Sequence, residues 1–187
     1  MAAKFLIVPG LNGSADGHWQ QWWLRDHDNA VLVEQDNWAV PDPDAWLANL
    51  VAAIDTHPNS VLVGHSLGSV LIGRLADHPI AALVRAALLV APADIERTRA
   101  LHSRPFAFGV MPERKLPFPA RLVASRDDIY MTFQRTLTLG RSWQCEVVDL
   151  GYVGHINIAS GYGRWQEGYR LAAAIGTEVP LKAVTTR

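Results

Sequence analysis

Residues 61–68 read Val-Leu-Val-Gly-His-Ser-Leu-Gly and are the most informative stretch of the chain. An apolar run precedes a Gly-x-Ser-x-Gly motif, and an apolar, helix-prone run follows it. This context is typical of a nucleophile elbow, a strained strand-to-helix turn that exposes a serine hydroxyl above a sheet. The following helix would point its free N–H groups at that serine. We therefore expect Ser66 to be a nucleophile and the N–H of Leu67 to be half of an oxyanion hole; the alternative is a plain tight turn.

Short apolar runs alternate with longer helix-prone stretches along the chain. The runs predict strands at 5–9, 31–34, 60–64, 86–90, 120–124 and 146–150, and the stretches predict helices at 18–27, 43–56, 66–78, 130–141 and 164–176. Continuous rather than alternating apolar runs indicate strands buried on both faces. In the second helix, Pro43 suits the first turn and Asp42 is placed to cap it. The pattern predicts an α/β fold, a mostly parallel sheet of about six strands with helices on both faces.

Length and composition limit the possible classes of protein. The chain has 187 residues, 49% of them hydrophobic, and its net charge is −1. These values predict one folded domain over 1–176, with a flexible tail at 177–187, and argue against disorder. The 17 basic residues balance 18 acidic ones without forming a basic run, so we expect no nucleic-acid partner.

The single cysteine and the N-terminus carry little functional signal. Cys145 has no partner for an intrachain disulfide and lies at the expected start of a strand, which favours packing over catalysis. The apolar run at 5–8 is too short for a signal sequence or a membrane span. We expect a cytoplasmic protein that has no membrane partner.

A proline-rich segment at 94–119 interrupts the alternation of strands and helices. It contains four prolines, which predict a long loop with at most one short helix. No other stretch is long enough to cover a site, so we expect an open, shallow pocket without a large lid domain.

A serine nucleophile needs a base, and His155 is the best placed of the seven histidines. It follows the last expected strand in a glycine-rich loop, at the carboxyl edge of the sheet where α/β proteins bind ligands. The other six lie at helix ends, in turns, in the irregular segment or in the elbow. His65, in the elbow, points away from the serine by our expectation but remains a candidate for substrate binding.

The base in turn needs an acid to orient it. Asp127 and Asp128 both follow the expected strand at 120–124, and position alone does not separate them. Asp149 is a weaker candidate at the end of the last strand. The competing interpretation is that the Asp127–Asp128 pair caps the helix expected from residue 130; one carboxylate could cap while the other orients His155.

The loop after the first expected strand is the candidate for the rest of the site. In this architecture it supplies the second oxyanion N–H, from Leu11 or Asn12. A phosphate-binding loop is the rival, but the glycines lack Gly-x-Gly-x-x-Gly spacing. Downstream, the spacing of the tryptophans predicts that they pack a helix on the sheet, with Trp19 as a candidate lining the substrate pocket.

Several blocks together resemble the small serine hydrolases related to retinoblastoma-binding protein 9. They are Val-Pro-Gly at 8–10, His-Trp-Gln at 18–20, Gly-His-Ser-Leu-Gly at 64–68, Ser-Arg-Asp-Asp at 125–128, Gly-His-Ile-Asn at 154–157 and Ser-Gly-Tyr-Gly at 160–163. The resemblance implies a compact α/β-hydrolase fold and a Ser-Asp-His triad whose acid is Asp128. The animal member's pocket-protein motif, Leu-x-Cys-x-Glu, is absent here, so that partner is not implied.

The expected function is therefore hydrolysis of a small carboxylic ester, with no metal or organic cofactor. A thioesterase or amidase with the same triad is an alternative, and so is an idle scaffold that keeps the fold. A metal-dependent hydrolase is a weaker option because no clustered ligand motif is present. The natural substrate and the oligomeric state are left open.

Overall fold

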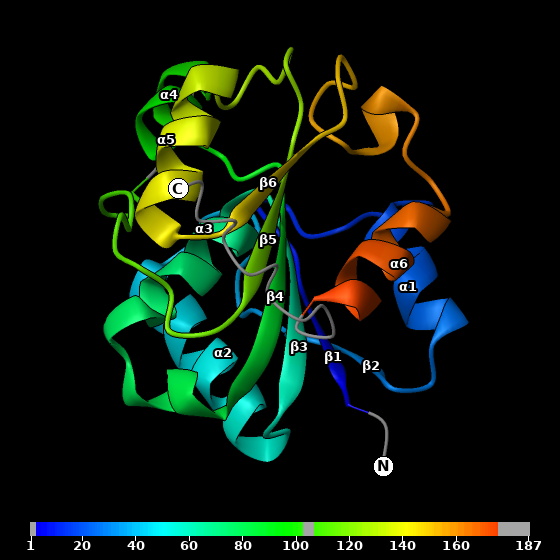
Figure 1. Cartoon of the computed structure of the whole chain (residues 1–187), viewed down its shortest axis with the longest axis vertical. Coiled ribbons are helices and arrows are strands. Elements are labelled where there is room, and N and C mark those ends of the chain that lie inside the picture. The colour runs from blue at the N-terminus through cyan, green and yellow to red at the C-terminus, as the bar shows by residue number, and fades with distance from the viewer. Residues whose placement is uncertain (1–2, 103–106, 176–187) are drawn as a thin grey trace, which may run out of the picture.

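The computed structural model describes residues 3–102 and 107–175, so the expected tail at 177–187 lies outside the described residues. Its centre is a parallel sheet with the strand order β2-β1-β3-β4-β5-β6 (Figure 1). The strands are β1 Phe5–Val8, β2 Ala30–Leu32, β3 Ser60–His65, β4 Val84–Val90, β5 Ala120–Ala124 and β6 Glu146–Asp149. All pairs being parallel, the carboxyl ends of β1, β3, β5 and β6 meet at one edge, as the sequence predicted.

Helices cover both faces of the sheet (Figure 1). They are α1 Trp19–Asp26, α2 Pro43–Thr56, α3 Leu67–Gly73, α4 Ile95–Leu101, α5 Phe133–Trp143 and α6 Gln166–Ala174, with 3₁₀ turns η1 Arg74–Asp77, η2 Pro79–Leu83 and η3 Ile158–Ser160. One core lies under α2, α3 and α5, and the other under α1 and α6. Neighbouring strand residues alternate between them: Leu62 packs in the first core and Val63 in the second. This explains the continuous apolar runs.

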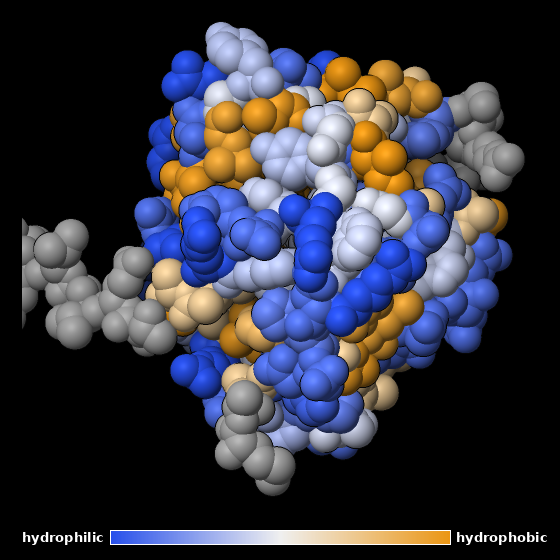
Figure 2. Space-filling model, turned by 90° about the vertical axis from the view of Figure 1, so that its right-hand side faces the viewer, coloured by the Kyte–Doolittle hydropathy of each residue, from blue (hydrophilic) through white to orange (hydrophobic). Residues whose placement is uncertain are grey.

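The surface differs in character between the middle and the upper end of the molecule. Figure 2, which faces the side covered by α1 and α6, shows hydrophilic residues over the middle and hydrophobic ones gathered mainly toward the upper end. None of the helices in the described parts of the chain is long and apolar enough to cross a membrane.

The bounds of α2 agree with the sequence, whereas two other helices differ from the predicted ranges. The side chain of Asp42 accepts hydrogen bonds from the N–H groups of Asp44 and Ala45, and Pro43 opens α2 as predicted. The helix expected over 66–78 ends earlier, because the chain tightens into η1 after Gly73. The helix expected from residue 130 begins at Phe133, because Thr132 is its N-cap.

The proline-rich segment is more ordered than a loop over its described part. It contains the helix α4, and it is fixed to the first core by the buried residues Phe108, Leu116 and Phe118. Two residues from this helix region, Thr98 and His102, reach the pocket described below. Residues 103–106 lie outside the described residues. The segment therefore forms one wall of the pocket.

Candidate active site

Ser66 occupies a strained turn between β3 and α3. Its backbone has φ 56° and ψ −123°, in the left-handed region that a non-glycine residue rarely adopts. A Cβ atom on Gly68 would lie 2.0 Å from the carbonyl oxygen of Val8, and one on Gly64 would lie 2.9 Å from the backbone of Ser69. Both glycines of the motif are therefore required by close backbone approach, which allows β1 and α3 to pack directly around the serine.

The side chains of Ser66, His155 and Asp128 form a hydrogen-bonded chain. His155 Nε2 lies 2.9 Å from Ser66 Oγ, and His155 Nδ1 lies 2.8 Å from Asp128 Oδ2. All three residues are buried. With the proton on Nδ1 held by the carboxylate, Nε2 is free to accept the serine proton, which is the arrangement of a general base beside a nucleophile.

The two neighbouring aspartates have different partners. The carboxylate of Asp128 also accepts a hydrogen bond from the Tyr130 N–H, so a single side chain both orients His155 and shapes the turn. Asp127 instead accepts hydrogen bonds from Ser125 Oγ at 2.7 Å and from the Gly154 N–H at 2.8 Å. These bonds, the first above all, lower the pKa of Asp127. Neither aspartate caps α5.

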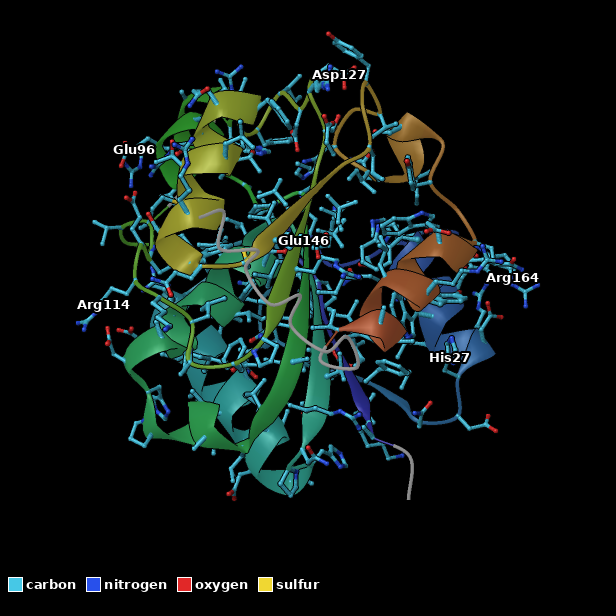
Figure 3. The ribbon with its side chains drawn as sticks, viewed as in Figure 1. His27, Glu96, Arg114, Asp127, Glu146 and Arg164 are labelled. Atoms are coloured by element: carbon cyan, nitrogen blue, oxygen red, sulfur yellow. The ribbon has the colours of Figure 1, made fainter. Side chains whose placement is uncertain are left out.

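Asp127 joins the loop after β5 to the loop that carries His155. Figure 3 shows it at the upper end of the molecule. The same two loops are also joined by the Arg126 N–H donating to the Gly151 carbonyl at 2.7 Å. Asp149, the weaker candidate for the acid, pairs with the side chain of Arg126 and does not contact His155. Asp149 therefore stabilises the loop after β5 through its ion pair with Arg126.

Two backbone N–H groups are available beside Ser66. Leu67 is the first residue of α3, so its N–H has no acceptor within the helix. On the β1 loop the Asn12 N–H donates to the Trp38 carbonyl at 2.8 Å, which leaves Leu11 as the better candidate of the two that the sequence allowed. Gly10 brings this loop close, since a Cβ there would lie 2.8 Å from the Cβ of Ser66.

The candidate role of Trp19 in substrate binding is wrong. Its side chain is fully buried in the second core and is absent from the pocket wall. Its indole Nε1–H donates to the Ile156 carbonyl at 2.8 Å. Trp19 thus fixes the backbone next to His155 instead of contacting a ligand; helical spacing predicted that it packs, but not which tertiary partner it meets.

His65 lies closer to the reacting groups than we expected. Its ring lines the pocket, 4.9 Å from the ring of His155, and its Nε2 lies 3.0 Å from the His155 carbonyl. Burial, followed by the proximity of His155, lowers the pKa of His65 well below its usual value. A neutral His65 that donates from Nε2 therefore holds the His155 loop in place.

Two polar residues at the start of α1 were missed by the sequence reasoning. Gln20 is fully buried, and its amide donates to the carbonyls of Val8, the last residue of β1, and of Val63 within the neighbouring strand β3. His18 is the N-cap of α1 and lines the pocket. The signal was the polar pair beside Trp19 in the 18–20 block, at the start of a helix that otherwise packs on the sheet.

The pocket in front of Ser66 is small, and its described wall carries no carboxylate, ammonium or guanidinium group. It has a volume of about 260 Å³. Its wall is formed by the β1 loop, by Ser66 and His155, by Thr98 and His102 from the α4 region, and by Tyr130 and Ile158. Among residues 3–102 and 107–175, none of those that line the pocket is an aspartate, glutamate, lysine or arginine. His102, expected in an irregular loop, stacks on Tyr130 at the edge of this wall.

Other reactive groups lie away from the pocket. Burial raises the pKa of the Cys145 thiol to about 12, as suits a packed cysteine at the start of β6. Within residues 3–102 and 107–175, no group of three or more histidine, cysteine, aspartate or glutamate side chains is arranged to hold a metal ion.

A doubly covered parallel sheet with a strained serine elbow at its carboxyl edge defines the class of α/β-hydrolases. The comparison with family models makes the assignment narrower: the family described as Serine hydrolase matches residues 5–174, and the chain belongs to this family. The protein is therefore an enzyme, a serine hydrolase.

Solved structures agree with this assignment. A YdeN-like hydrolase of Pectobacterium atrosepticum is 30% identical, with 91% of this chain and 89% of that chain covered and a TM-score of 0.79. The ydeN gene product of B. subtilis is 22% identical, with 92% and 98% covered and a TM-score of 0.71. Thermogutta terrifontis esterase 2 shares the fold at 16% identity, with 91% and 81% covered and a TM-score of 0.67. No curated protein matches the chain.

Proposed function

We propose that the enzyme hydrolyses small, uncharged carboxylic esters by acyl transfer through Ser66, with His155 as general base and acid and Asp128 as the orienting acid. The observation that carries the proposal is the pair of hydrogen bonds of 2.9 and 2.8 Å that join the three side chains. This arrangement matches the order nucleophile, base and acid that activates a serine.

The reaction would proceed in two halves. Ser66 Oγ attacks the ester carbonyl carbon while His155 Nε2 takes the serine proton. The negative oxygen is held by the N–H groups of Leu67 and Leu11; loss of one such donor typically costs about 3–4 kcal/mol of transition-state stabilisation. His155 then gives the proton to the leaving alkoxide, and the acyl-enzyme forms. Water, deprotonated by His155, attacks the acyl group, and collapse releases the acid and restores Ser66.

The size and charge of the pocket support the substrate class. Its volume of about 260 Å³ falls at the lower end of the range for ligand pockets, roughly 300–1,000 Å³. Because the described residues of the wall include no aspartate, glutamate, lysine or arginine, they offer no carboxylate, ammonium or guanidinium partner to a charged substrate. A small neutral ester fits both properties. Thioesters and amides remain alternatives for the same triad.

We also propose the narrower relationship to the group of retinoblastoma-binding protein 9. The His-Trp-Gln block at 18–20 supports it, because in this structure all three side chains lie buried around the elbow and the His155 loop.

The test is turnover of a panel of small esters, thioesters and aminoacyl amides by wild type and Ser66→Ala. Ser69→Ala is the matched control: Ser69 is another buried serine on α3, its hydroxyl donates to the Val90 carbonyl, and that carbonyl keeps a second donor in the Ser66 N–H.

We expect ester turnover by wild type and Ser69→Ala and none above background by Ser66→Ala. Turnover of thioesters or amides in place of esters would correct the substrate class. An inactive wild type across the panel would favour the idle scaffold.

A further inference from the structure

His18 has a defined tautomer because it caps a helix. Its Nδ1 accepts a hydrogen bond of 3.2 Å from the Gln20 N–H at the start of α1. A nitrogen that accepts carries no proton, so the proton of the neutral ring is on Nε2. The ring of His18 therefore presents one donor, Nε2–H, on the side away from the helix.

The surroundings of His18 keep the ring neutral and fixed. It packs 5.3 Å from the ring of Trp19 and 4.9 Å from that of His65, which in turn packs 4.9 Å from His155. Burial, and then the proximity of His155, lowers the pKa of His18 to about 4. His18 thus remains an uncharged donor at neutral pH.

The Nε2–H of His18 has no partner among the described residues, although His18 shares a pocket wall with Ser66 and His155. A second polar group of that wall is also unpaired there: Thr98 is 2% exposed, and its hydroxyl has no hydrogen-bond partner within the described part of the chain. Buried polar groups are normally paired, so the unpaired Thr98 hydroxyl indicates that a ligand completes this wall, and the Nε2–H of His18 offers that ligand a second polar contact.

We propose that His18 is a specificity-determining residue whose Nε2–H binds an uncharged acceptor oxygen of the substrate close to the scissile ester. The preferred substrates would then be small esters that carry an ether, hydroxyl or carbonyl oxygen next to the ester group. This inference rests on the proposed function and makes its substrate class narrower.

The rival explanation is that His18 only caps α1. The chain contains a matched control for it, because His78 is the N-cap of η2 and accepts from the Ile80 N–H at the same distance of 3.2 Å. His78 lies outside the Ser66 pocket. Asparagine is a good N-cap residue, so His18→Asn and His78→Asn keep a cap while removing the imidazole.

The experiment measures kcat/KM of wild type and both variants on two pairs of esters that differ by one CH₂-to-oxygen exchange. The acyl pair is 4-nitrophenyl butyrate and 4-nitrophenyl methoxyacetate; the alcohol pair is n-butyl acetate and 2-methoxyethyl acetate. Differences in intrinsic reactivity cancel when each variant is compared with wild type on the same ester, and the pair that responds identifies the side on which the oxygen binds.

We expect His18→Asn to lose about tenfold more kcat/KM on the oxygen-bearing member of one pair than on its hydrocarbon partner, as suits the loss of one hydrogen bond. The His78→Asn ratios should equal those of wild type. Equal losses on both members of both pairs would overturn the inference and leave the proposed function intact. If wild type hydrolysed none of the four esters, the result would contradict both the proposed function and this inference.

The tautomer provides a readout that does not depend on turnover. Nitrogen-15 NMR of wild type should show His18 neutral and protonated on Nε2 from pH 5.5 to 8. A proton on Nδ1, or protonation of the ring near pH 6.5, would overturn the inference whatever the kinetics.

Discussion

The nucleophile side and the acid–base side of the pocket are built differently. On the nucleophile side, β1 and the β3–α3 elbow approach so closely that glycine is required at Gly10, Gly64 and Gly68. On the acid–base side, the loops after β5 and β6 are joined by hydrogen bonds from side chains, chiefly Asp127 and Ser125. Close backbone packing positions the nucleophile side, and hydrogen bonds from side chains position the acid–base side.

The difference teaches what each side tolerates. Packing against a backbone carbonyl leaves no room for even one methyl group. A substitution on the nucleophile side should therefore lower the stability of the fold. A network of hydrogen bonds can lose one member while the loops that it joins stay folded. A substitution on the acid–base side should therefore lower the catalytic rate before it lowers stability. Substitutions on the two sides should therefore separate stability from catalysis.

The largest expected effect is on the acid–base side. Asp128→Asn should lower kcat by roughly 10⁴-fold, because an amide favours the wrong tautomer of His155. The melting temperature should stay close to that of wild type. Steady-state kinetics and a thermal melt check both, and a loss below a hundredfold would remove Asp128 from the role of acid.

On the nucleophile side, Gly68→Ala should instead abolish the fold or destabilise it by at least about 3 kcal/mol, because its Cβ would lie 2.0 Å from the Val8 carbonyl. Gly163→Ala is the control, since a Cβ there would meet nothing nearer than 3.7 Å. Urea unfolding measures both. Similar stabilities for the two variants would contradict the packing argument.

Acid should weaken the nucleophile side first. The folded-state pKa of His18 is about 4 against an ordinary 6.5, so the unfolded chain binds the proton more readily, and stability falls as pH drops from 6.5 toward 4. This linkage is worth about 2 kcal/mol between pH 7.5 and 5. The pKa values of Asp127 and Asp149 are lowered in the folded state, so the stability that these two carboxylates contribute is lost only below about pH 4.

Urea unfolding at pH 7.5 and pH 5 checks this order. His18→Asn should lose less stability than wild type between the two pH values, while His78→Asn should lose as much as wild type. An equal loss in all three proteins would show that His18 titrates normally.

The smallest effect is expected at Asp127. Asp127→Asn keeps an acceptor for the Gly154 N–H and should cost at most about threefold in kcat, whereas Asp127→Ala removes it and should cost roughly tenfold. Steady-state kinetics on one ester is sufficient. A loss equal to that of Asp128→Asn would erase the distinction between the two carboxylates.

The sequence predicted what depends on local pattern and sheet geometry. Apolar runs and helical spacing located the strands and α2, and the carboxyl edge of a parallel sheet brought Ser66, His155 and the aspartate pair to one place. The sequence pattern alone could not decide between Asp127 and Asp128, because adjacent residues lie at the same edge of the sheet. Only the geometry of the turn directs the side chain of Asp128 toward His155.

Contacts between distant segments account for the rest. Trp19 meets Ile156, 137 positions away, and the His65 ring meets the backbone of His155, 90 positions away. Neither partner follows from spacing within one helix or one strand. The position of His18 in the pocket was missed for the same reason, whereas its cap is a local contact with the Gln20 N–H.

The most direct test of the central claim, that Ser66 is an activated nucleophile, is covalent labelling by a fluorophosphonate probe, read by intact mass and peptide mapping. Wild type should gain one label per chain, located on Ser66, Ser66→Ala should gain none, and Asp128→Asn should react far more slowly. A wild type that stays unlabelled, or a Ser66→Ala variant that labels as strongly, would contradict the account.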